Sequence, residues 1–263
     1  MAVVTRPVVG LRSGPGTRRE LVSQELWGRS LTVLGRRGDW LRCGTADGMR
    51  GWVPGSALAR DTLYEPTHVI IRRFAALRRG KRGELLLPMG SLLAVEKVSG
   101  GAARALAPDG STGRIAAGAL ARLKAGRVGP SKPPGPARAR TLLGRLVPEV
   151  IGTPYLWGGR STFGFDCSGL VQAAYEFLGI ALPRDSGDQA KRGRRVKSLE
   201  RLRPLDLVFF GSGGRIDHVA IHLGDLAILH ASGHVRLESL KPGDAAFRED
   251  LLERFAWATR PIT

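Results

Sequence analysis

One of the two cysteines stands at the start of an apolar segment, and two histidines follow it downstream. Cys167 precedes the run Ser168–Leu178, which has a helical pattern, and His218 and His230 come about fifty and sixty residues later. A helix N-terminus carries partial positive charge, and a nearby imidazolium lowers the pKa of a thiol further. A cysteine whose histidine partners meet it in the fold is a candidate nucleophile. These residue types predict a cysteine peptidase or amidase.

The two histidines lie on segments that alternate as strands do, which predicts an antiparallel pair. Side chains on such a pair share a face only when the connecting loop has the right parity. We predict a loop of odd length paired around Gly224, which places His218 and His230 on one face. A two-residue loop would send His230 to the opposite face and remove its role.

The remaining cysteine and histidines belong to no pattern that carries chemistry. Cys43 alternates within an apparent strand, which predicts a small buried hydrophobic side chain. His222 shares a strand face with His218 and is expected to be half-buried or exposed, without a catalytic role. His68 and His234 are expected on the surface or in loops. The spacings fit no usual zinc pattern, so neither a metal nor a cofactor is expected.

An internal repeat organises the first half of the chain. Shifted by 62 positions, residues 28–60 fall on 90–122, and twelve of the 33 aligned positions are identical. Short alternating segments broken by glycine turns predict two small all-β barrels, at 1–62 and 63–124. The second copy has Ala102 and Arg114 where the first has tryptophans, so it is expected to be degenerate. A proline-rich linker is predicted at 125–140.

From residue 141 to 263 the pattern becomes α+β. A first helix is expected near residues 142–150, broken or restarted at Pro148, and a second over Ser168–Leu178. Strands are expected around residues 207–210, 218–223 and 227–231. The chain is thus predicted to hold an α+β domain after two β barrels.

Several blocks of this second half occur in a familiar order. They are Gly152-Thr-Pro-Tyr-Leu-Trp-Gly-Gly159, Phe165-Asp-Cys-Ser-Gly-Leu170, Leu182-Pro-Arg-Asp-Ser186 with Gln189, Leu205-Asp-Leu-Val-Phe-Phe210, Asp217-His-Val-Ala-Ile221 and Leu229-His-Ala231. Together they resemble the NlpC/p60 family of papain-like cysteine peptidases, and the tryptophan-bearing first repeat resembles bacterial SH3-like domains. Family members usually carry glycine where this chain has Leu205 and Leu226, and both departures are expected to fall on turns.

The resemblance implies a role for each residue of the constellation. Cys167 is the nucleophile, His218 the general base and acid, and His230 the residue that orients His218. The backbone N–H of Cys167 and the hydroxyl of Tyr155 are candidate donors to the oxyanion, although Tyr155 could equally be a packed aromatic.

The arrangement of SH3-like domains before the peptidase is similar to γ-D-glutamyl-L-diamino-acid endopeptidases. In that group the substrate is a peptidoglycan stem peptide with a free N-terminal L-alanine. Candidate binders of its ammonium group are the polar side chains that flank the nucleophile and the proline turn, namely Asp166, Ser168, Asp185 and Ser186. Either aspartate could instead cap a helix. Trp52 and Tyr64 are the candidates for an aromatic that the first SH3-like copy contributes.

The formal net charge of +18 and the pI near 11.3 predict attraction to polyanions, among them wall polymers and their carboxylated peptides. The basic pairs are scattered along the chain and no nucleic-acid-binding motif is present, so nucleic acid is not an expected partner. No signal-peptide pattern and no membrane-spanning stretch is found, which predicts a cytoplasmic protein without membrane insertion. A secreted protein is the alternative if a leader has been removed.

The sequence leaves four functions open. The first is hydrolysis of the γ-D-glutamyl–diamino acid bond during muropeptide recycling. A secreted cell-wall hydrolase of the same chemistry is the second, and a non-catalytic wall-binding module is the third. The last is a transferase that hands the acyl group from the cysteine to an amine or a lipid.

Overall fold

The structure is a computed structural model, and it describes residues 1–60 and 62–262. The chain divides into two compact units, and each is described by itself. The first unit comprises Met1–Val128 together with Trp157–Phe163, and the second comprises Gly129–Leu156 and Gly164–Thr263.

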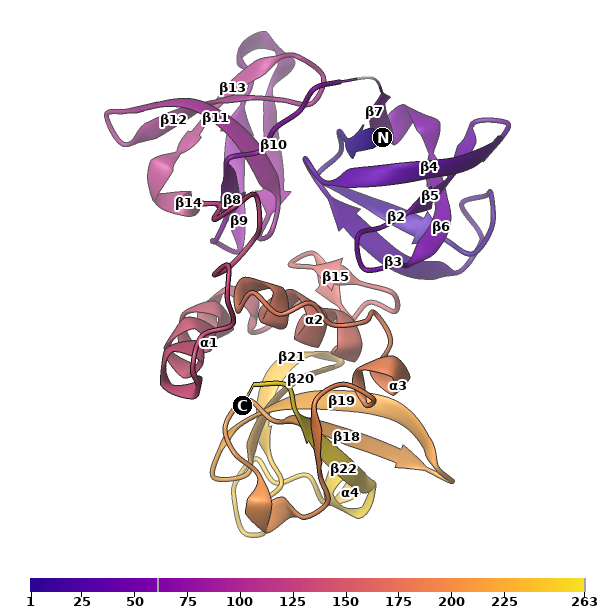
Figure 1. Cartoon of the computed structure of the whole chain (residues 1–263), viewed down its shortest axis with the longest axis vertical. Helices are drawn as coiled ribbons and strands as arrows, with labels where there is room; N and C mark the ends of the chain where they lie inside the picture. The colour runs from indigo at the N-terminus through magenta and orange to yellow at the C-terminus, as the bar shows by residue number, and fades with distance from the viewer. Residues whose placement is uncertain (61, 263) are drawn as a thin grey trace. The chain divides into compact units, whose positions relative to one another are not determined.

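Each copy of the repeat folds into seven short strands that curve around an apolar core (Figure 1). The first copy holds β1 (Ala2–Val4), β2 (Val8–Arg12), β3 (Leu21–Leu26), β4 (Ser30–Arg37), β5 (Trp40–Gly44), β6 (Arg50–Pro54) and β7 (Leu58–Arg60). The second holds β8 (His68–Ile70), β9 (Phe74–Arg78), β10 (Glu84–Pro88), β11 (Leu92–Ser99), β12 (Ala102–Leu106), β13 (Thr112–Ala116) and β14 (Leu120–Arg122).

The repeat found in the sequence is reproduced strand by strand. The strands β4 to β7 and β11 to β14 have the same lengths and are offset by the same 62 residues. The offset extends to a register shift in each copy, between Val33 and Gly35 and between Val95 and Lys97. Cys43 lies fully buried in the core of the first copy, as its alternation predicts. Both copies are therefore complete sheets, although the second has lost its tryptophans.

The two copies are joined through the turn after β3. Trp27 is fully buried among core residues of the second copy, and its carbonyl accepts from the N–H of Leu92 at 2.9 Å. Gly28 follows with a φ of +76°, and a Cβ placed on it would lie 2.1 Å from the carbonyl oxygen of Leu92. Glycine is required at this position by both backbone conformation and space.

A Gly28→Ala substitution should therefore weaken the first unit more than a matched control. Gly38 also has positive φ, +57°, but a Cβ there meets no atom within 4 Å. Gly38→Ala carries only the left-handed backbone cost of about 1–2 kcal/mol. Gly28→Ala adds overpacking, which should cost about 1–3 kcal/mol more in free energy of unfolding. Denaturant unfolding of both variants measures the difference, and equal losses would contradict this account of the junction.

The segment at residues 157–163 belongs to the first unit although it follows the first long helix in sequence. Trp157 Nε1 donates to Glu20 at 3.0 Å, and Gln24 Oε1 accepts from both the N–H of Arg160 and the hydroxyl of Ser161 at 2.9 Å. The predicted boundary at residue 141 therefore needs correction, because seven residues of the later range pack with the SH3-like copies. Sequence order could not reveal this packing, since the contacts join positions more than 130 residues apart.

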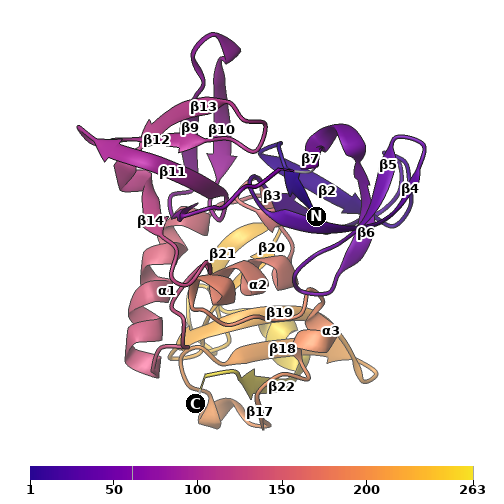
Figure 2. The ribbon, with the colours of Figure 1, turned by 45° about the horizontal axis from the view of Figure 1, so that its top comes forward.

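The second unit is built on a six-stranded antiparallel sheet in the order β17-β22-β18-β19-β20-β21. Helix α2 packs against β19 and β20, and α1 lies beside α2 (Figures 1 and 2). The helices are α1 (Pro136–Val150), α2 (Cys167–Phe177), α3 (Ser186–Gln189) and α4 (Glu249–Glu253). The strands are β16 (Gly164–Phe165), β17 (Arg194–Val196), β18 (Leu207–Ser212), β19 (Arg215–Gly224), β20 (Ala227–Ser232), β21 (His234–Ser239) and β22 (Phe255–Arg260), whereas β15 (Arg160–Ser161) belongs to the first unit.

Helix α1 corrects two predictions. It begins at Pro136, inside the predicted linker of 125–140, and it continues through Pro148 to Val150 without a break. Proline fits the first turn of a helix because the N–H it lacks would have no partner there. Among the residues that the structure describes, no helix combines the length and apolar character that a membrane crossing requires.

Candidate active site

The thiol of Cys167 lies at the N-terminus of α2, against β19. Asp166 caps this helix by accepting from the N–H of Gly169 at 2.7 Å, so the chain turns sharply just before the cysteine. The cysteine side chain is only 7% exposed, and backbone hydrogen bonds reach its sulfur from Val219 and Ser168. Val219 directly follows His218 in β19, so the fold brings the thiol and the histidine into one neighbourhood.

The pKa of this thiol is raised by its surroundings. Burial raises the pKa of Cys167 to about 11, the charge of Asp166 acts in the same direction, and the hydrogen bonds from Val219 and Ser168 oppose both. The sequence predicts a thiolate favoured by the helix start and an imidazolium. Desolvation of the thiol outweighs the helix start in the free protein, so the sulfur holds its proton at neutral pH.

His218 and His230 form a direct hydrogen bond. The Nε2 of His218 lies 2.8 Å from the Nδ1 of His230, and the rings meet edge to face with centroids 5.1 Å apart. His230 is fully buried, whereas His218 is half-buried. The predicted pairing of the two histidines on one face is confirmed by this bond.

The loop and strand register that place both histidines on one face differ from the predicted ones. The turn between β19 and β20 has two residues, Asp225 and Leu226, both with positive φ, enclosed by the pair Gly224 and Ala227. A two-residue turn alone would flip His230, but the register shifts between His222 and Gly224. The extra residue in β19 restores the parity, so the loop prediction is wrong and its consequence still holds.

Burial also lowers the pKa values of His218 and His230. The pKa of His218 falls to about 3 because its ring is desolvated and because His230 and Arg254 lie nearby. The pKa of His230 is lowered by burial, while its bond to Glu238 acts in the opposite direction. At neutral pH the thiol and both imidazoles are therefore uncharged. This arrangement can take a proton from the thiol as the sulfur attacks a carbonyl carbon, by general base catalysis.

Sequence reasoning missed Glu238, which extends this chain of contacts. Its Oε2 lies 2.6 Å from the Nε2 of His230, and its side chain is 9% exposed. Arg248 donates to Oε2 at 2.6 Å and Arg236 to Oε1 at 3.0 Å. The sequence of β21 gave no such signal, because Val235 and Leu237 alternate with Arg236 and Glu238 and favour an outward Glu238, whereas Leu237 is exposed and Glu238 buried.

Tyr155 lies close enough to the thiol to interact with it electrostatically. Burial raises the pKa of Tyr155 to about 12, and Cys167 and Asp166 act in the same direction. The phenol therefore keeps its proton at neutral pH and can donate a hydrogen bond. Its side chain remains 36% exposed, which leaves it accessible to a substrate.

Asp166 and Ser168 lie in a buried ion-pair cluster with Arg184. The Nη2 of Arg184 lies 2.6 Å from Asp166 Oδ2, and its Nη1 donates to Asp166 Oδ1 and to the hydroxyl of Ser168 at 3.0 and 2.9 Å. All three side chains are at most 7% exposed. Asp166 therefore caps α2, the alternative to ammonium binding that was expected from the sequence. Because Arg184 already contacts both Asp166 and Ser168, the geometry does not support an ammonium site at either residue.

Asp185 and Ser186 are arranged differently. Asp185 is exposed at the N-cap position of α3, but its side chain makes no capping hydrogen bond. The capping alternative is therefore wrong for Asp185. Ser186 is half-buried beside it. Of the four predicted substrate-binding residues, this pair is the more exposed one, and its role in binding an ammonium stays a prediction.

Comparisons with known proteins agree with this geometry. The profile of the NlpC/P60 family matches residues 152–249, and that of the bacterial dipeptidyl-peptidase Sh3 domain matches residues 11–58. A γ-D-glutamyl-L-lysine dipeptidyl-peptidase of Bacillus cereus is 30% identical over 231 residues, which cover 81% of this chain and 67% of that protein. The chain belongs to the NlpC/P60 family.

Two further relatives bear on the two parts of this NlpC/P60 protein. A crystal structure of an NlpC/P60 family protein from Bacillus cereus superposes with a TM-score of 0.86 at 25% identity, covering 100% of this chain and 99% of that one. The peptidoglycan endopeptidase RipB of Mycobacterium tuberculosis is 42% identical over 111 residues, which are 37% of this chain and 45% of RipB. NlpC/P60 peptidases are cysteine-type hydrolases, and the first of these matches extends to the SH3-like copies.

The departures from the NlpC/P60 glycines fall on strained turns. Leu205 has a φ of +76° and Leu226 a φ of +58°, the region that glycine adopts without cost. Both leucines pack against apolar residues, since Leu205 is 3% exposed and Leu226 contacts the core beneath the sheet. Asp206, next to the first turn, is fully buried and is held by Arg260 through two contacts of 2.7 Å.

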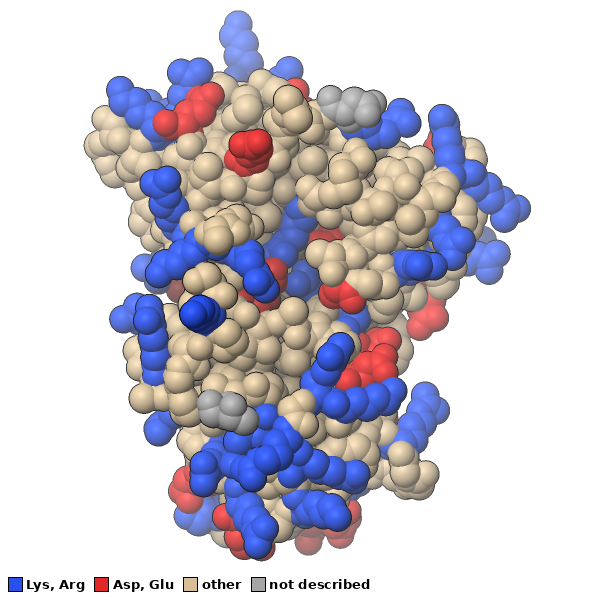
Figure 3. Space-filling model, in the orientation of Figure 1, with Lys and Arg blue, Asp and Glu red and all other residues tan. Residues whose placement is uncertain are grey.

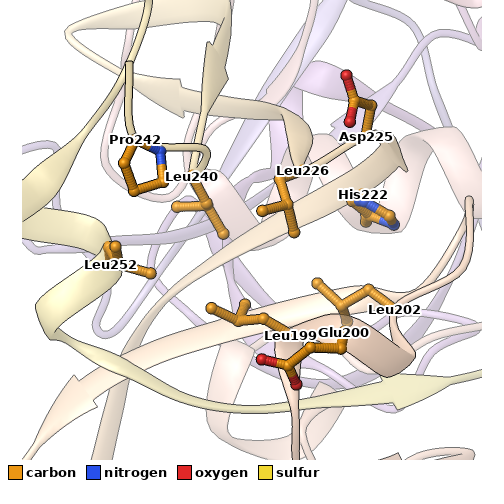
Figure 4. A pocket seen from close by; sticks show the side chains of 9 residues that line it. All are labelled: Leu199, Glu200, Leu202, His222, Asp225, Leu226, Leu240, Pro242 and Leu252. Atoms are coloured by element: carbon orange, nitrogen blue, oxygen red, sulfur yellow. The ribbon is translucent and has the colours of Figure 1, made fainter. Parts of the chain in front are cut away.

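His222 is separate from the catalytic constellation of this NlpC/P60 domain. It is 3% exposed, so the expectation of a half-buried or exposed ring is wrong. Figure 4 shows its ring at the edge of a cavity of about 440 Å³ whose other lining residues are mostly leucines. Neither ring nitrogen has a hydrogen-bond partner within the described part of the chain. His68 is half-buried beside Thr67, and His234 is exposed.

The two aromatic candidates of the SH3-like copies, Tyr64 and Trp52, differ in how accessible they are. Tyr64 is 8% exposed, and its hydroxyl donates to the carbonyl of Leu92 at 3.0 Å and accepts from the N–H of Ala94 at 3.2 Å. Its polar group is therefore used within the first unit, which contradicts a role in contacting substrate. Trp52 is half-buried in β6 and keeps part of its ring accessible.

The positive charge is less scattered in space than along the sequence. Arg194, Arg195, Lys197 and Arg201 line one groove of the second unit beside β17. Arg195 stacks over the ring of Trp257 at 4.0 Å from its centroid. Figure 3 shows a dense group of basic side chains over the lower part of the visible face. This surface suits ligands that carry several carboxylates.

Proposed function

We propose that the chain is a cysteine endopeptidase that hydrolyses the bond between γ-D-glutamate and a diamino acid in peptidoglycan stem peptides. The observation that carries the proposal is a buried thiol at the start of α2 that is hydrogen-bonded by the backbone of Val219, the residue after His218, while His218 is itself bonded to His230. The similarity to the γ-D-glutamyl-L-lysine dipeptidyl-peptidase spans 81% of the chain, SH3-like copies included, and supports the choice of bond.

The residues act in a defined order in this proposal. The sulfur of Cys167 attacks the γ-carbonyl carbon of D-glutamate while His218 accepts the thiol proton, and the backbone N–H of Cys167 and the hydroxyl of Tyr155 stabilise the oxyanion. His218 then gives its proton to the leaving amine of the diamino acid, and the C–N bond breaks. Water attacks the thioester, His218 takes its proton, and the thiol is restored as the acid leaves.

The preferred substrate in this proposal has a free N-terminal L-alanine, as in muropeptide recycling. The exposed carboxylate of Asp185 and the hydroxyl of Ser186 would receive the ammonium group. The basic character of the chain suits peptides with several free carboxylates. A cytoplasmic location for this reaction stays a prediction from the sequence.

A secreted cell-wall hydrolase of the same chemistry is the second candidate. It is favoured by the 42% identity of the peptidase region to the peptidoglycan endopeptidase RipB. The two candidates differ in what they require of the substrate's N-terminus. A hydrolase of intact wall must accept peptides whose L-alanine is acylated, whereas a recycling enzyme needs the free amine.

Mass spectrometry of products separates these functions. The protein is incubated with L-Ala-γ-D-Glu-L-Lys, with the meso-diaminopimelate analogue, and with the N-acetylated form of each. We expect release of L-Ala-D-Glu from the free peptides and at least a tenfold lower rate for the acetylated ones, roughly the value of one charge-assisted contact. Asp185→Asn should reduce the preference, and Asp188→Asn, in the same short helix and paired with Lys191, is its matched control.

Each other outcome points to a different function. Equal cleavage of free and acetylated peptides would contradict the recycling role and favour the wall hydrolase. A product that carries an added amine instead of water would indicate a transferase. If no peptide is cleaved and no acyl group is found on Cys167, the binding-module alternative replaces the proposal.

A further inference from the structure

A chain of hydrogen bonds leads from His218 into the protein and ends on a carboxylate. The Nε2 of His218 meets Nδ1 of His230 at 2.8 Å, and Nε2 of His230 meets Oε2 of Glu238 at 2.6 Å. The residues come from three consecutive strands, β19, β20 and β21 (Figure 1). His230 pairs with Arg236 across β20 and β21, so Glu238 lies diagonal to it on the same face.

The partners in this chain determine which nitrogen carries each proton. Glu238 accepts hydrogen bonds from Arg236 and Arg248, as an ionised carboxylate does. An acceptor at this place requires the N–H of His230 to be at Nε2, which leaves Nδ1 of His230 as an acceptor. Nδ1 can then be satisfied only by an N–H at Nε2 of His218. The remaining nitrogen of His218, Nδ1, is left without a proton.

We propose that Glu238 is a positioning residue that fixes the tautomer of His218 through His230, so that Nδ1 of His218 is the base for the thiol. This inference rests on the proposed function for its catalytic meaning, but the tautomer itself does not. A neutral third histidine could otherwise carry its proton on either nitrogen. Glu238 removes that ambiguity, as a carboxylate does when it is bonded to a catalytic imidazole directly.

Two arginines keep Glu238 in place. Arg248 contacts the same oxygen that receives His230, and Arg236 contacts the other, so both carboxylate oxygens are held. Arg248 is also bonded to Asp250 at 2.7 Å through two nitrogens, which fixes its guanidinium. Two further charged residues affect His218: Arg254 lowers the pKa of its ring and Asp250 raises it. The clamp makes the carboxylate a rigid acceptor, which a tautomer-setting group must be.

The test is nitrogen NMR of the native full-length protein labelled on histidine rings, beside two variants. In the native protein His218 and His230 should both carry the proton on Nε2. Glu238→Met removes the acceptor, so His230 and His218 should show the Nδ1–H form or a mixture, and kcat on L-Ala-γ-D-Glu-L-Lys should fall about 10²-fold with KM little changed. Glu238→Gln keeps an acceptor oxygen and should retain the tautomer with kcat within about tenfold.

The matched control is Glu249→Met, which removes an exposed carboxylate on the adjacent helix α4 and should change neither readout. An Nδ1 proton on His218 in the native protein would overturn the inference, and this measurement needs no variant to fold. Equal kcat values for native protein and a folded Glu238→Met variant would overturn it as well. If the tautomers are as expected and no peptide is cleaved, the proposed function fails while the tautomer assignment stands.

Discussion

A Cys167→Ala variant should lose at least about 10⁴-fold in kcat/KM on L-Ala-γ-D-Glu-L-Lys, because it lacks the sulfur that forms the acyl bond. The loss should appear in kcat, since the side chain forms a bond to substrate only during reaction. The variant should still bind the peptide, because the cavity left by one sulfur atom does not alter α2. Product release followed by mass spectrometry measures the rate, and calorimetric titration with the intact peptide measures the retained affinity.

Cys43→Ala is the matched control for this experiment. Cys43 is the other cysteine, fully buried in the core of the first SH3-like copy, and burial raises the pKa of its thiol to about 11 as well. Its loss should cost some stability and leave kcat/KM unchanged. In the native protein a short reaction quenched in acid should show an acyl group on Cys167 and none on Cys43. Full activity of the Cys167→Ala variant would remove the cysteine mechanism altogether.

The repeat was predictable from sequence because its signal is carried by turns. Glycines such as Gly38 and Gly100, with φ of +57° in both copies, mark the same hairpin 62 residues apart. The shared sequence Ala-Leu-Ala-Arg marks the last strand of each copy. Positive φ restricts which residues can stand at a turn, so turn positions keep their identity while tryptophans on the strands are lost.

The loop between the histidines was not predictable for a related reason. Asp225 and Leu226 form a tight turn in the left-handed region, where glycine or asparagine is the usual signal. The register shift at Leu223 leaves no mark in the alternation of apolar residues. That His218 and His230 share a face was still correctly predicted, because the resemblance to the NlpC/p60 family assigned His230 the role of orienting His218.

The substrate-side residues were harder to assign because sequence shows types and not partners. Asp166 and Asp185 both precede a helix and both flank candidate site residues. The two differ in burial, because only Asp166 is buried against Arg184. Arg184 comes from a loop eighteen positions away from Asp166. The arginine was visible in the motif, but nothing in its spacing showed that it faces inward.

Arg184 is also where the largest effect on stability is expected. Its guanidinium is 4% exposed and supplies the opposite charge to Asp166, whose carboxylate in turn caps α2 beside the candidate nucleophile. It also lowers the pKa of the thiol, against burial and the charge of Asp166. Removing it takes away the cation that faces the buried carboxylate of Asp166, to which the N–H of Gly169 and the hydroxyl of Ser168 also donate.

Arg184→Met should therefore reduce the free energy of unfolding by about 3–5 kcal/mol, the usual cost of leaving one partner of a buried ion pair alone. Asp166→Asn removes the charge and keeps an oxygen for Gly169, so the double variant Arg184→Met with Asp166→Asn should recover a large part of that loss. A double-mutant cycle in denaturant measures the coupling between the two residues.

Arg78→Met, which breaks an exposed ion pair with Glu84 on the surface of the second SH3-like copy, should cost less than about 1 kcal/mol. If Arg184→Met is as mild as this control, or if the double variant is no more stable than the single one, the pair does not hold the start of α2. In that case the backbone hydrogen bonds in the first turn of α2, and not the ion pair, hold the thiol of Cys167 in place.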